Sequence, residues 1–170
     1  MRALVSLTLS GLIAGPAFAA DMKLSVEIPR LAVAEYHRPY VAIWLEKPDQ
    51  TFVGNLAVWY DYKLKNNEGT KWLKDMRQWW RRTGRELTMP VDGLTSATRA
   101  PGEHQVAIDL GKAPLSGLAA GEYQIVVEAA REVGGRELLR IPFQWPPKSE
   151  QTLKTPGKDE LGAVTLSLKP

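Results

Sequence analysis

Short stretches of alternating apolar and polar residues constrain the fold of this chain more than any other sequence feature. In the stretch 22–28, Met22, Leu24, Val26 and Ile28 alternate with Lys23, Ser25 and Glu27. Successive side chains of a β-strand point to opposite faces, so this pattern predicts a strand with one buried face. Related patterns predict further strands at 39–46, 52–60, 103–109, 122–130, 136–145 and 163–169.

The connections between these stretches indicate how the strands are arranged. Lys47-Pro48-Asp49-Gln50 is turn chemistry, so the two strands that flank it should form an antiparallel hairpin. Val126 makes the stretch 122–130 apolar on both faces, which suits a strand inside a sheet. The segment 146–157 is expected to be an irregular polar connection. About seven strands with turns between them predict an immunoglobulin-like antiparallel β-sandwich.

One segment has the period of a helix instead. Five apolar side chains recur at the spacing of one helical face: Trp72, Leu73, Met76, Trp79 and Trp80. Thr70 is suited to cap the start of a helix and Gly84 to end it, which predicts one helix over 70–82. The predicted fold class is therefore mainly β, with one inserted amphipathic helix.

The first residues have the pattern of a secretory signal peptide. Arg2 supplies a positive charge, 3–14 are mainly apolar, and Ala17-Phe18-Ala19 puts small residues at both positions that determine cleavage. The apolar run is short for a membrane-spanning helix. We therefore expect a signal peptide at 1–19, cleavage after Ala19, and a single β-sandwich domain over 20–170. The mature protein is expected in the periplasm, with no stable membrane insertion.

The composition argues against several classes of function. The chain has no Cys, which excludes disulfides and cysteine-ligated metals. Its two His residues, His37 and His104, argue against a histidine-based metal centre. A net charge of only +3 gives no reason to expect a nucleic acid partner. The sequence contains no hydrolase elbow, metalloprotease motif or phosphate-binding glycine loop, so no catalytic residue is assigned.

The most specific motif lies in the central loop, which reads Asp92-Gly93-Leu94-Thr95-Ser96-Ala97-Thr98. It resembles the attachment signal of bacterial flavin transferases, which esterify the phosphate of FMN onto a hydroxyl. That signal runs Asp, two free positions, Ser or Thr, usually Gly, then Ala and the acceptor. The resemblance implies that Thr98 is the covalent FMN acceptor and that Asp92, Thr95, Ser96 and Ala97 belong to the recognised signal. Ser96 stands where the signal usually has Gly.

The side chains of this loop are suited to a tight turn and to a bound cofactor. Asp92 and Thr95 can accept hydrogen bonds from backbone N–H groups, and Gly93 permits positive φ, so these residues can hold a tight turn. Ala97 leaves room for a bulky cofactor, and Arg99 can neutralise phosphate charge. The acceptor hydroxyl should be exposed enough to enter the active site of another enzyme. The alternative is an ordinary loop, because the same residue types are common between strands.

A family resemblance extends beyond this loop. Its five blocks are Arg38-Pro39-Tyr40-Val41-Ala42-Ile43-Trp44-Leu45-Glu46, Thr95-Ser96-Ala97-Thr98-Arg99-Ala100-Pro101-Gly102, Gly121-Glu122-Tyr123, Val127-Glu128-Ala129-Ala130-Arg131-Glu132 and Glu160-Leu161-Gly162. These blocks resemble the exported bacterial family known as domain of unknown function 2271, in which His is expected at the position of Val133. Such proteins look like neighbours of PepSY-type membrane reductases and flavin transferases, often in iron-acquisition settings. The resemblance implies membership of an extracytoplasmic electron-transfer system.

Tryptophans and arginines in the predicted helix suggest further contacts. Trp79 and Trp80 are adjacent and point about 100° apart on a helix, so at least one of them should be partly exposed. Because an aromatic ring can stack on an isoalloxazine, both are candidates to shield a flavin. Trp44 and Trp72 are expected in the core. The nearby arginines suit a solvated helix face, or else attract an acidic partner or an anionic ferric chelate: Arg77, Arg81, Arg82 and Arg85.

Three functions remain open at this point. The leading hypothesis is a periplasmic accessory protein that carries FMN on Thr98 and relays electrons between a membrane-embedded reductase and an extracytoplasmic acceptor. Such a protein is a redox carrier rather than a stand-alone enzyme. The alternative is a non-redox binding or scaffold module with the same fold. The third hypothesis is a direct ligand binder that uses the tryptophan and arginine face.

Overall fold

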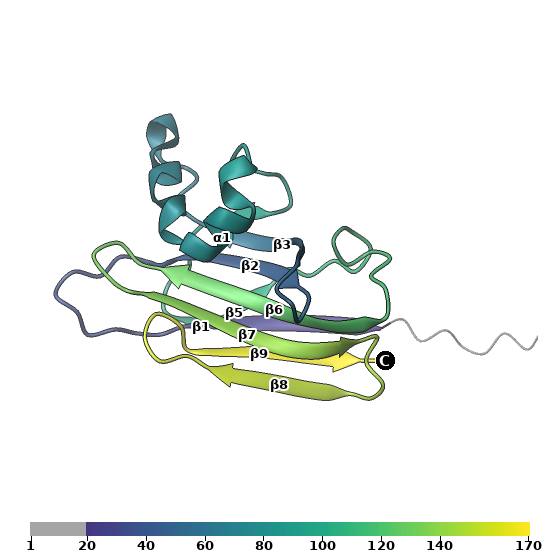
Figure 1. Ribbon diagram of the computed structural model, residues 1–170. Helices are drawn as coiled ribbons and strands as arrows, with labels where there is room; N and C mark the ends of the chain where they lie inside the picture. Colours follow the sequence, from purple (N-terminus) through teal and green to yellow (C-terminus); the bar gives the residue numbers. More distant parts are fainter. Residues whose placement is uncertain (1–19) are drawn as a thin grey trace, which may run out of the picture.

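Two β-sheets lie face to face in the computed structural model, which describes residues 20–170 (Figure 1). The signal-peptide prediction for 1–19 lies outside these residues. One sheet has the order β5-β1-β9-β8: Gly102–Val106, Asp21–Ile28, Ala163–Lys169 and Gln151–Pro156. The other has the order β4-β3-β2-β6-β7: Thr95–Ser96, Phe52–Trp59, Tyr40–Glu46, Gly121–Ala130 and Arg136–Trp145. The prediction of a mainly β sandwich is confirmed.

Two strands lie where the sequence predicted none. Strand β8 occupies half of the expected irregular connection 146–157 and pairs with β9, with Leu153 opposite Leu166. Its residues are only partly buried or exposed, because β8 is an edge strand, so no buried face marks it in the sequence. Strand β4 pairs in parallel with β3. It has only two residues and is therefore too short to produce an alternating pattern.

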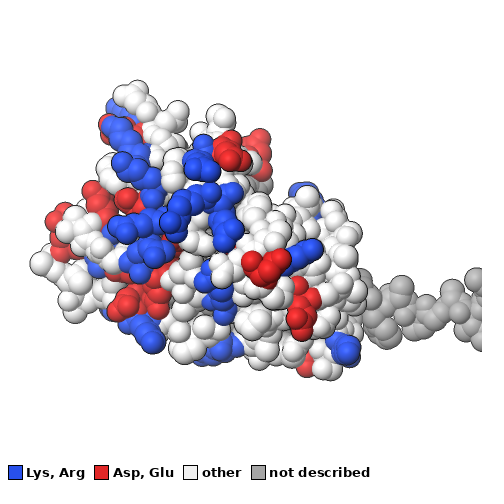
Figure 2. Space-filling model, in the orientation of Figure 1, with Lys and Arg blue, Asp and Glu red and all other residues white. Residues whose placement is uncertain are grey.

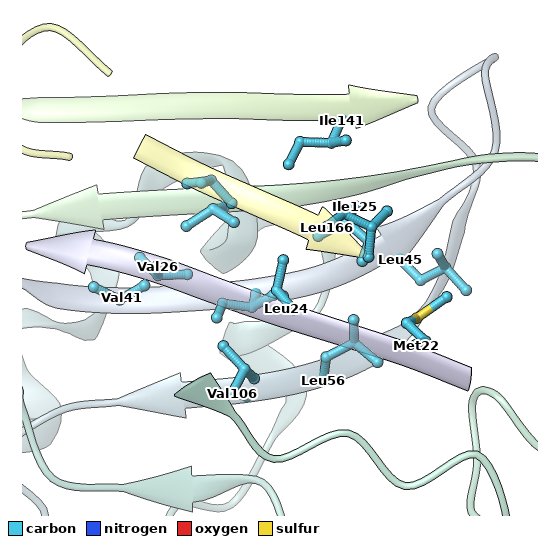
Figure 3. Close-up of a cluster of buried hydrophobic side chains, with 14 of the residues drawn as sticks. Met22, Leu24, Val26, Val41, Leu45, Leu56, Val106, Ile125, Ile141 and Leu166 are labelled. Atoms are coloured by element: carbon cyan, nitrogen blue, oxygen red, sulfur yellow. The ribbon is translucent and has the colours of Figure 1, made fainter. Parts of the chain in front are cut away.

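The main hydrophobic core lies between the two sheets. Figure 3 shows Leu24, Val26 and Leu166 of the four-stranded sheet packed with Val41 and Ile125 of the other. These five side chains are fully buried. The alternating pattern of the sequence therefore reports the faces that meet in this core.

A tyrosine at the start of β6 adds a feature found in immunoglobulin-like domains. The Tyr123 hydroxyl donates a hydrogen bond to the carbonyl of Ala119, four residues upstream, at 2.9 Å. This is the arrangement of a tyrosine corner, which ties the entry of a strand to the preceding loop. Strand β6 itself lies between β2 and β7, as the apolar pattern around Val126 predicted.

The five-stranded sheet is buried on its outer face as well. Residues 61–90, which we call the helical insert, cover this face and contain η1 (Lys65–Asp75), α1 (Arg77–Arg82) and η2 (Gly84–Glu86). Leu73 and Trp79 of the insert pack with Trp44 of β2, and all three are buried. Packing on both faces explains why every residue of β2 is buried.

The prediction of one continuous helix over 70–82 is wrong. The 3₁₀ segment η1 ends at Asp75, and Met76 has φ −75° and ψ 73°, which interrupts the helix before α1 begins. Thr70 caps no helix, since its hydroxyl donates to the carbonyl of Asn67 at 2.7 Å. The apolar spacing does identify side chains that pack on the sheet, namely Leu73, Met76 and Trp79. That spacing reflects contact with the sheet and does not require a continuous helix.

A buried carboxylate fixes the start of α1 to the sheet. Glu128 of β6 is fully buried and accepts the backbone N–H groups of Gln78 at 3.0 Å and Trp79 at 2.7 Å. The same side chain pairs with Arg136 of β7 at 2.7 Å. Negative charge at the first amides of a helix is favourable, so Glu128 acts as a tertiary cap for α1.

Candidate functional site

Segments that are far apart in sequence meet at one end of the sandwich. Tyr40 at the start of β2 lies opposite Ala130 at the end of β6, and Val41 lies opposite Trp59 at the end of β3. A cavity of about 330 Å³ lies here, which we call the Thr98 cavity. Its walls include Tyr36, Arg38, Tyr40, Asp61, Trp72 and Thr98.

Thr98, the residue proposed from the motif as the FMN acceptor, is part of the wall of this cavity. Its hydroxyl donates a hydrogen bond to Asp61 Oδ1 at 3.0 Å. Thr98 is only 7% exposed, whereas the preceding Ala97 is exposed. The expectation of an exposed acceptor hydroxyl is therefore wrong for this conformation. A modifying enzyme would have to reach Thr98 through the cavity or displace its loop.

The turn that precedes Thr98 is held largely as the sequence suggested. Thr95 Oγ1 accepts the backbone N–H of Val91 at 2.9 Å, and the Thr95 N–H donates to the Val91 carbonyl at 3.0 Å. Gly93 has a φ of +74°, a conformation that favours glycine. Asp92 is exposed, and its side chain makes no hydrogen bond to another residue in 20–170. Thr95 therefore holds the turn, contrary to the expected contribution of Asp92.

Ser96 lies in an extended backbone that does not require glycine. It belongs to β4, and its carbonyl accepts the N–H of Tyr60 at 3.0 Å. The Ser96 hydroxyl accepts a hydrogen bond from Arg99 Nη2 at 3.3 Å. Arg99 lies 5.1 Å from the centre of the Trp59 ring and is not in the wall of the Thr98 cavity. Arg38 is the arginine that lines the cavity, and sequence reasoning missed it.

The aromatic wall of the Thr98 cavity comes from Trp72, Tyr36 and Tyr40. Trp79, one of the two predicted flavin-shielding residues, belongs to α1 and is fully buried between this helix and the sheet. Trp80 is partly exposed, as expected for one member of the pair, but it lines a separate hollow on the insert. Trp72 was expected in the core, yet it lies half-buried at the edge of the insert cluster. Its helical spacing gave no sign of that edge position.

Carboxylates outnumber cations in the cavity wall. The wall has three carboxylates, Asp61, Asp75 and Glu132, and one arginine, Arg38. His37 Nδ1 lies 3.6 Å from Glu132 Oε2. Burial raises the pKa of Tyr40 to about 12, and the negative charge of Asp61 adds to the rise. Tyr40 is therefore a neutral phenol at physiological pH. The predicted absence of a metal centre remains an expectation, and no three His, Cys, Asp or Glu side chains in the described range are grouped to bind an ion.

Residues 21–163 match the model of a family described as "Predicted periplasmic protein (DUF2271)". The chain belongs to this family. The match runs from β1 to the first residue of β9, so it includes the whole five-stranded sheet, the Thr98 cavity and the four-stranded sheet apart from the rest of β9. No curated protein and no solved structure matches the chain. None of the helices in residues 20–170 is long and apolar enough to cross a membrane.

Proposed function

We propose that this DUF2271 protein is a periplasmic electron-transfer accessory protein that carries FMN in phosphoester linkage on Thr98. The observation that carries the proposal is the position of Thr98. A residue singled out by a linear motif stands in the wall of a cavity that also has three aromatic side chains. The cavity volume of about 330 Å³ lies in the range of small-molecule sites, roughly 300–1,000 Å³.

The aromatic side chains around the cavity suit the isoalloxazine ring of a flavin, although the wall offers only one arginine against three carboxylates. Trp72 and Tyr40 offer aromatic faces for offset stacking and exclude water from the ring. Arg38 and Asp75 offer a donor and an acceptor for the polar edge of an isoalloxazine. A second hollow of about 610 Å³ shares Trp72 and Glu132 with the first. The two hollows adjoin along these shared residues, which gives space for a ligand larger than the first cavity.

FMN bound in this way supplies reversible electron transfer, and the chain supplies attachment and surroundings. With a flavin dinucleotide as donor, Thr98 Oγ1 would bond to the FMN phosphorus, the phosphoanhydride bond would break to release a nucleoside monophosphate, and the hydroxyl would lose its proton. Asp61 accepts the hydrogen bond of that hydroxyl at 3.0 Å, so its carboxylate is placed to receive the proton. The esterified oxygen has no proton left, so modification abolishes this hydrogen bond.

Two partners follow from the proposal. A flavin transferase would recognise the exposed Asp92 and Ala97 in the turn before the acceptor. A PepSY-type membrane-embedded reductase would supply electrons, and the extracytoplasmic acceptor would be reached in an iron-acquisition setting. A signal peptide cleaved after Ala19 would deliver the protein to the compartment of both partners.

The second candidate function is a non-redox binding or scaffold module. One observation favours it: the Thr98 hydroxyl already donates a hydrogen bond to Asp61, and Thr98 is buried. In this case the Thr98 cavity would take a non-covalent ligand or none, and the motif would be a structural turn.

The colour of the purified protein separates the two functions. The precursor is expressed in a host with an exported flavin transferase and then denatured and run on a gel. We expect in-gel flavin fluorescence that is lost in Thr98→Ala and retained in Thr98→Ser, because a serine hydroxyl can also accept FMN. Thr88→Ala, at an exposed threonine of the insert, is the matched control and should stay fluorescent. A colourless wild-type protein beside a modified control substrate would favour the binding module.

A further inference from the structure

The charge of this protein is unevenly distributed, and its cationic excess lies on the helical insert. Residues 61–90 contain eight Lys and Arg against four Asp and Glu, a net charge of +4, whereas the whole chain carries +3. The other 140 residues therefore carry −1 in total. In Figure 2, Lys and Arg side chains gather over the helical segments and the strands beside them. The insert is thus the cationic pole of the molecule.

Most cations of α1 and the end of η1 are not neutralised by neighbours. The ion pairs of the insert within the described residues involve only Lys71 with Glu68 and Arg85 with Glu86. Six exposed cations of the insert have no carboxylate partner among the described residues: Lys63 and Lys65, and then Lys74, Arg77, Arg81 and Arg82 at the end of η1 and in α1. Arg81 donates a hydrogen bond to Gln78 Oε1, and Arg82 donates one to Gln50 Oε1. These neutral acceptors orient the two guanidinium groups without neutralising their charge.

These cations stand on a fixed platform. The carboxylate of Glu128 holds the first amides of α1, so the helix that presents Arg81 and Arg82 cannot shift freely over the sheet. Arg136 and Arg140 belong to β7 of the sheet that the insert covers, and Arg136 pairs with the Glu128 carboxylate that caps α1. Their partners, Glu128 and Glu46, are fully buried, so the neutralising carboxylates are not displayed at the surface.

The insert also has a partly apolar hollow. Trp80, Leu87 and Met89 are each partly buried and line a depression of about 290 Å³ on the insert. Trp80 belongs to α1, directly before Arg81. Arginine next to a half-exposed tryptophan is a combination that favours the interface between lipid headgroups and acyl chains.

We propose that the helical insert docks on an anionic phospholipid surface. Lys74, Arg77, Arg81 and Arg82 would contact headgroup phosphates, for which the guanidinium fork is well suited, and Trp80 would lie at headgroup depth. An acidic protein is the competing occupant of this surface, and the experiment below distinguishes the two. The inference is independent of FMN on Thr98. It would place the protein next to a membrane-embedded reductase.

Vesicle co-sedimentation tests the proposal with the mature protein, residues 20–170. We expect it to bind vesicles of phosphatidylglycerol and phosphatidylcholine, to leave pure phosphatidylcholine unbound, and to dissociate as salt is raised. Each cation near an anionic membrane contributes about 1 kcal/mol to the binding free energy. Arg81→Gln with Arg82→Gln should therefore lower the partition coefficient by about 30-fold. Lys148→Gln with Lys154→Gln removes the same charge from exposed positions outside the insert, and should change it by less than about threefold.

Three outcomes would overturn the proposal. The first is no binding to the phosphatidylglycerol vesicles at low salt. The second is an equal loss of binding in the two double variants, because it would mean that net charge alone drives association. The third is retention on immobilised polyglutamate without binding to vesicles, which would assign the surface to an acidic protein. Urea unfolding of both double variants checks that neither change disturbs the fold.

Discussion

Replacing Glu128 by Gln should loosen the start of α1 from the sheet and destabilise the protein. The two carboxylate oxygens of Glu128 accept three hydrogen bonds, from the N–H groups of Gln78 and Trp79 and from Arg136. A glutamine has the same shape but only one acceptor oxygen, and its NH₂ group cannot face an N–H donor. The substitution therefore leaves at least one donor at the start of α1 without a partner.

The magnitude follows from the burial of these groups. An unsatisfied buried N–H costs about 1–3 kcal/mol. The lost ion pair adds less than about 1 kcal/mol, because the Arg136 side chain is 40% exposed and remains hydrated. We therefore expect Glu128→Gln to lower the free energy of unfolding by about 1–4 kcal/mol, a sizeable part of the roughly 5–15 kcal/mol typical of a domain.

Urea unfolding monitored by tryptophan fluorescence measures this change, because Trp79 is fully buried in the contact between the insert and the sheet. Glu122→Gln is the matched control: Glu122 lies on the same strand but is exposed, so its replacement should change stability by less than about 0.5 kcal/mol. Hydrogen exchange should also become faster at the amides of Gln78 and Trp79. A Glu128→Gln protein as stable as the control, with unchanged exchange, would refute the assignment of Glu128 as the anchor of the insert.

Three further predictions concern the Thr98 cavity and its surroundings. Asp61→Asn should slow flavin attachment to Thr98 by at least about tenfold, measured by intact mass against time, because an amide cannot take the hydroxyl proton; an unchanged rate would exclude that role for Asp61. The pKa of Tyr40 is raised to about 12, so its neutral form contributes stability below pH 10 that is lost as the pH rises towards 12. In urea titrations, Tyr40→Phe should reduce the loss of unfolding free energy between pH 10 and 12 by about 2–3 kcal/mol. A variant whose unfolding free energy falls with pH as steeply as that of the wild type would contradict this account. Val133 has φ +52° and is 74% exposed, so Val133→Asn should raise the free energy of unfolding by about 1 kcal/mol, while Val33→Asn, at a position without positive φ, should not.

The sequence predicts strands well where one face is buried in the sandwich core. Strands β1, β2, β6, β7 and β9 follow their alternating or apolar stretches closely, because packing against the opposite sheet imposes the pattern. Strand β8 escaped because an edge strand with no fully buried residue leaves no such pattern. The insert was misjudged as one helix because contact with the outer face of the sheet, and not a continuous helix, set the spacing of Leu73, Met76 and Trp79.

The candidate site was only partly accessible to sequence reasoning. The motif marked Thr98 and the turn around Gly93, because both depend on local chemistry. Asp61 and Trp72 could not be connected to Thr98 from the sequence, since they are brought to it by the pairing of β3 with β4 and by the folding of the insert. Tertiary contacts of this kind carry no spacing rule. For the same reason the sequence favoured Trp79, which is buried, over Trp72, which lines the cavity.

The intact mass of the mature protein tests the central claim most directly. The precursor is co-expressed with an exported flavin transferase, in parallel with an inactive form of that enzyme, and the purified protein is weighed and then digested. The account predicts one added FMN less one water on the protein from the active co-expression alone, with the added mass on the peptide that contains Thr98. A protein of unmodified mass in both cultures, while a control substrate is modified, would contradict the proposal that Thr98 carries a flavin.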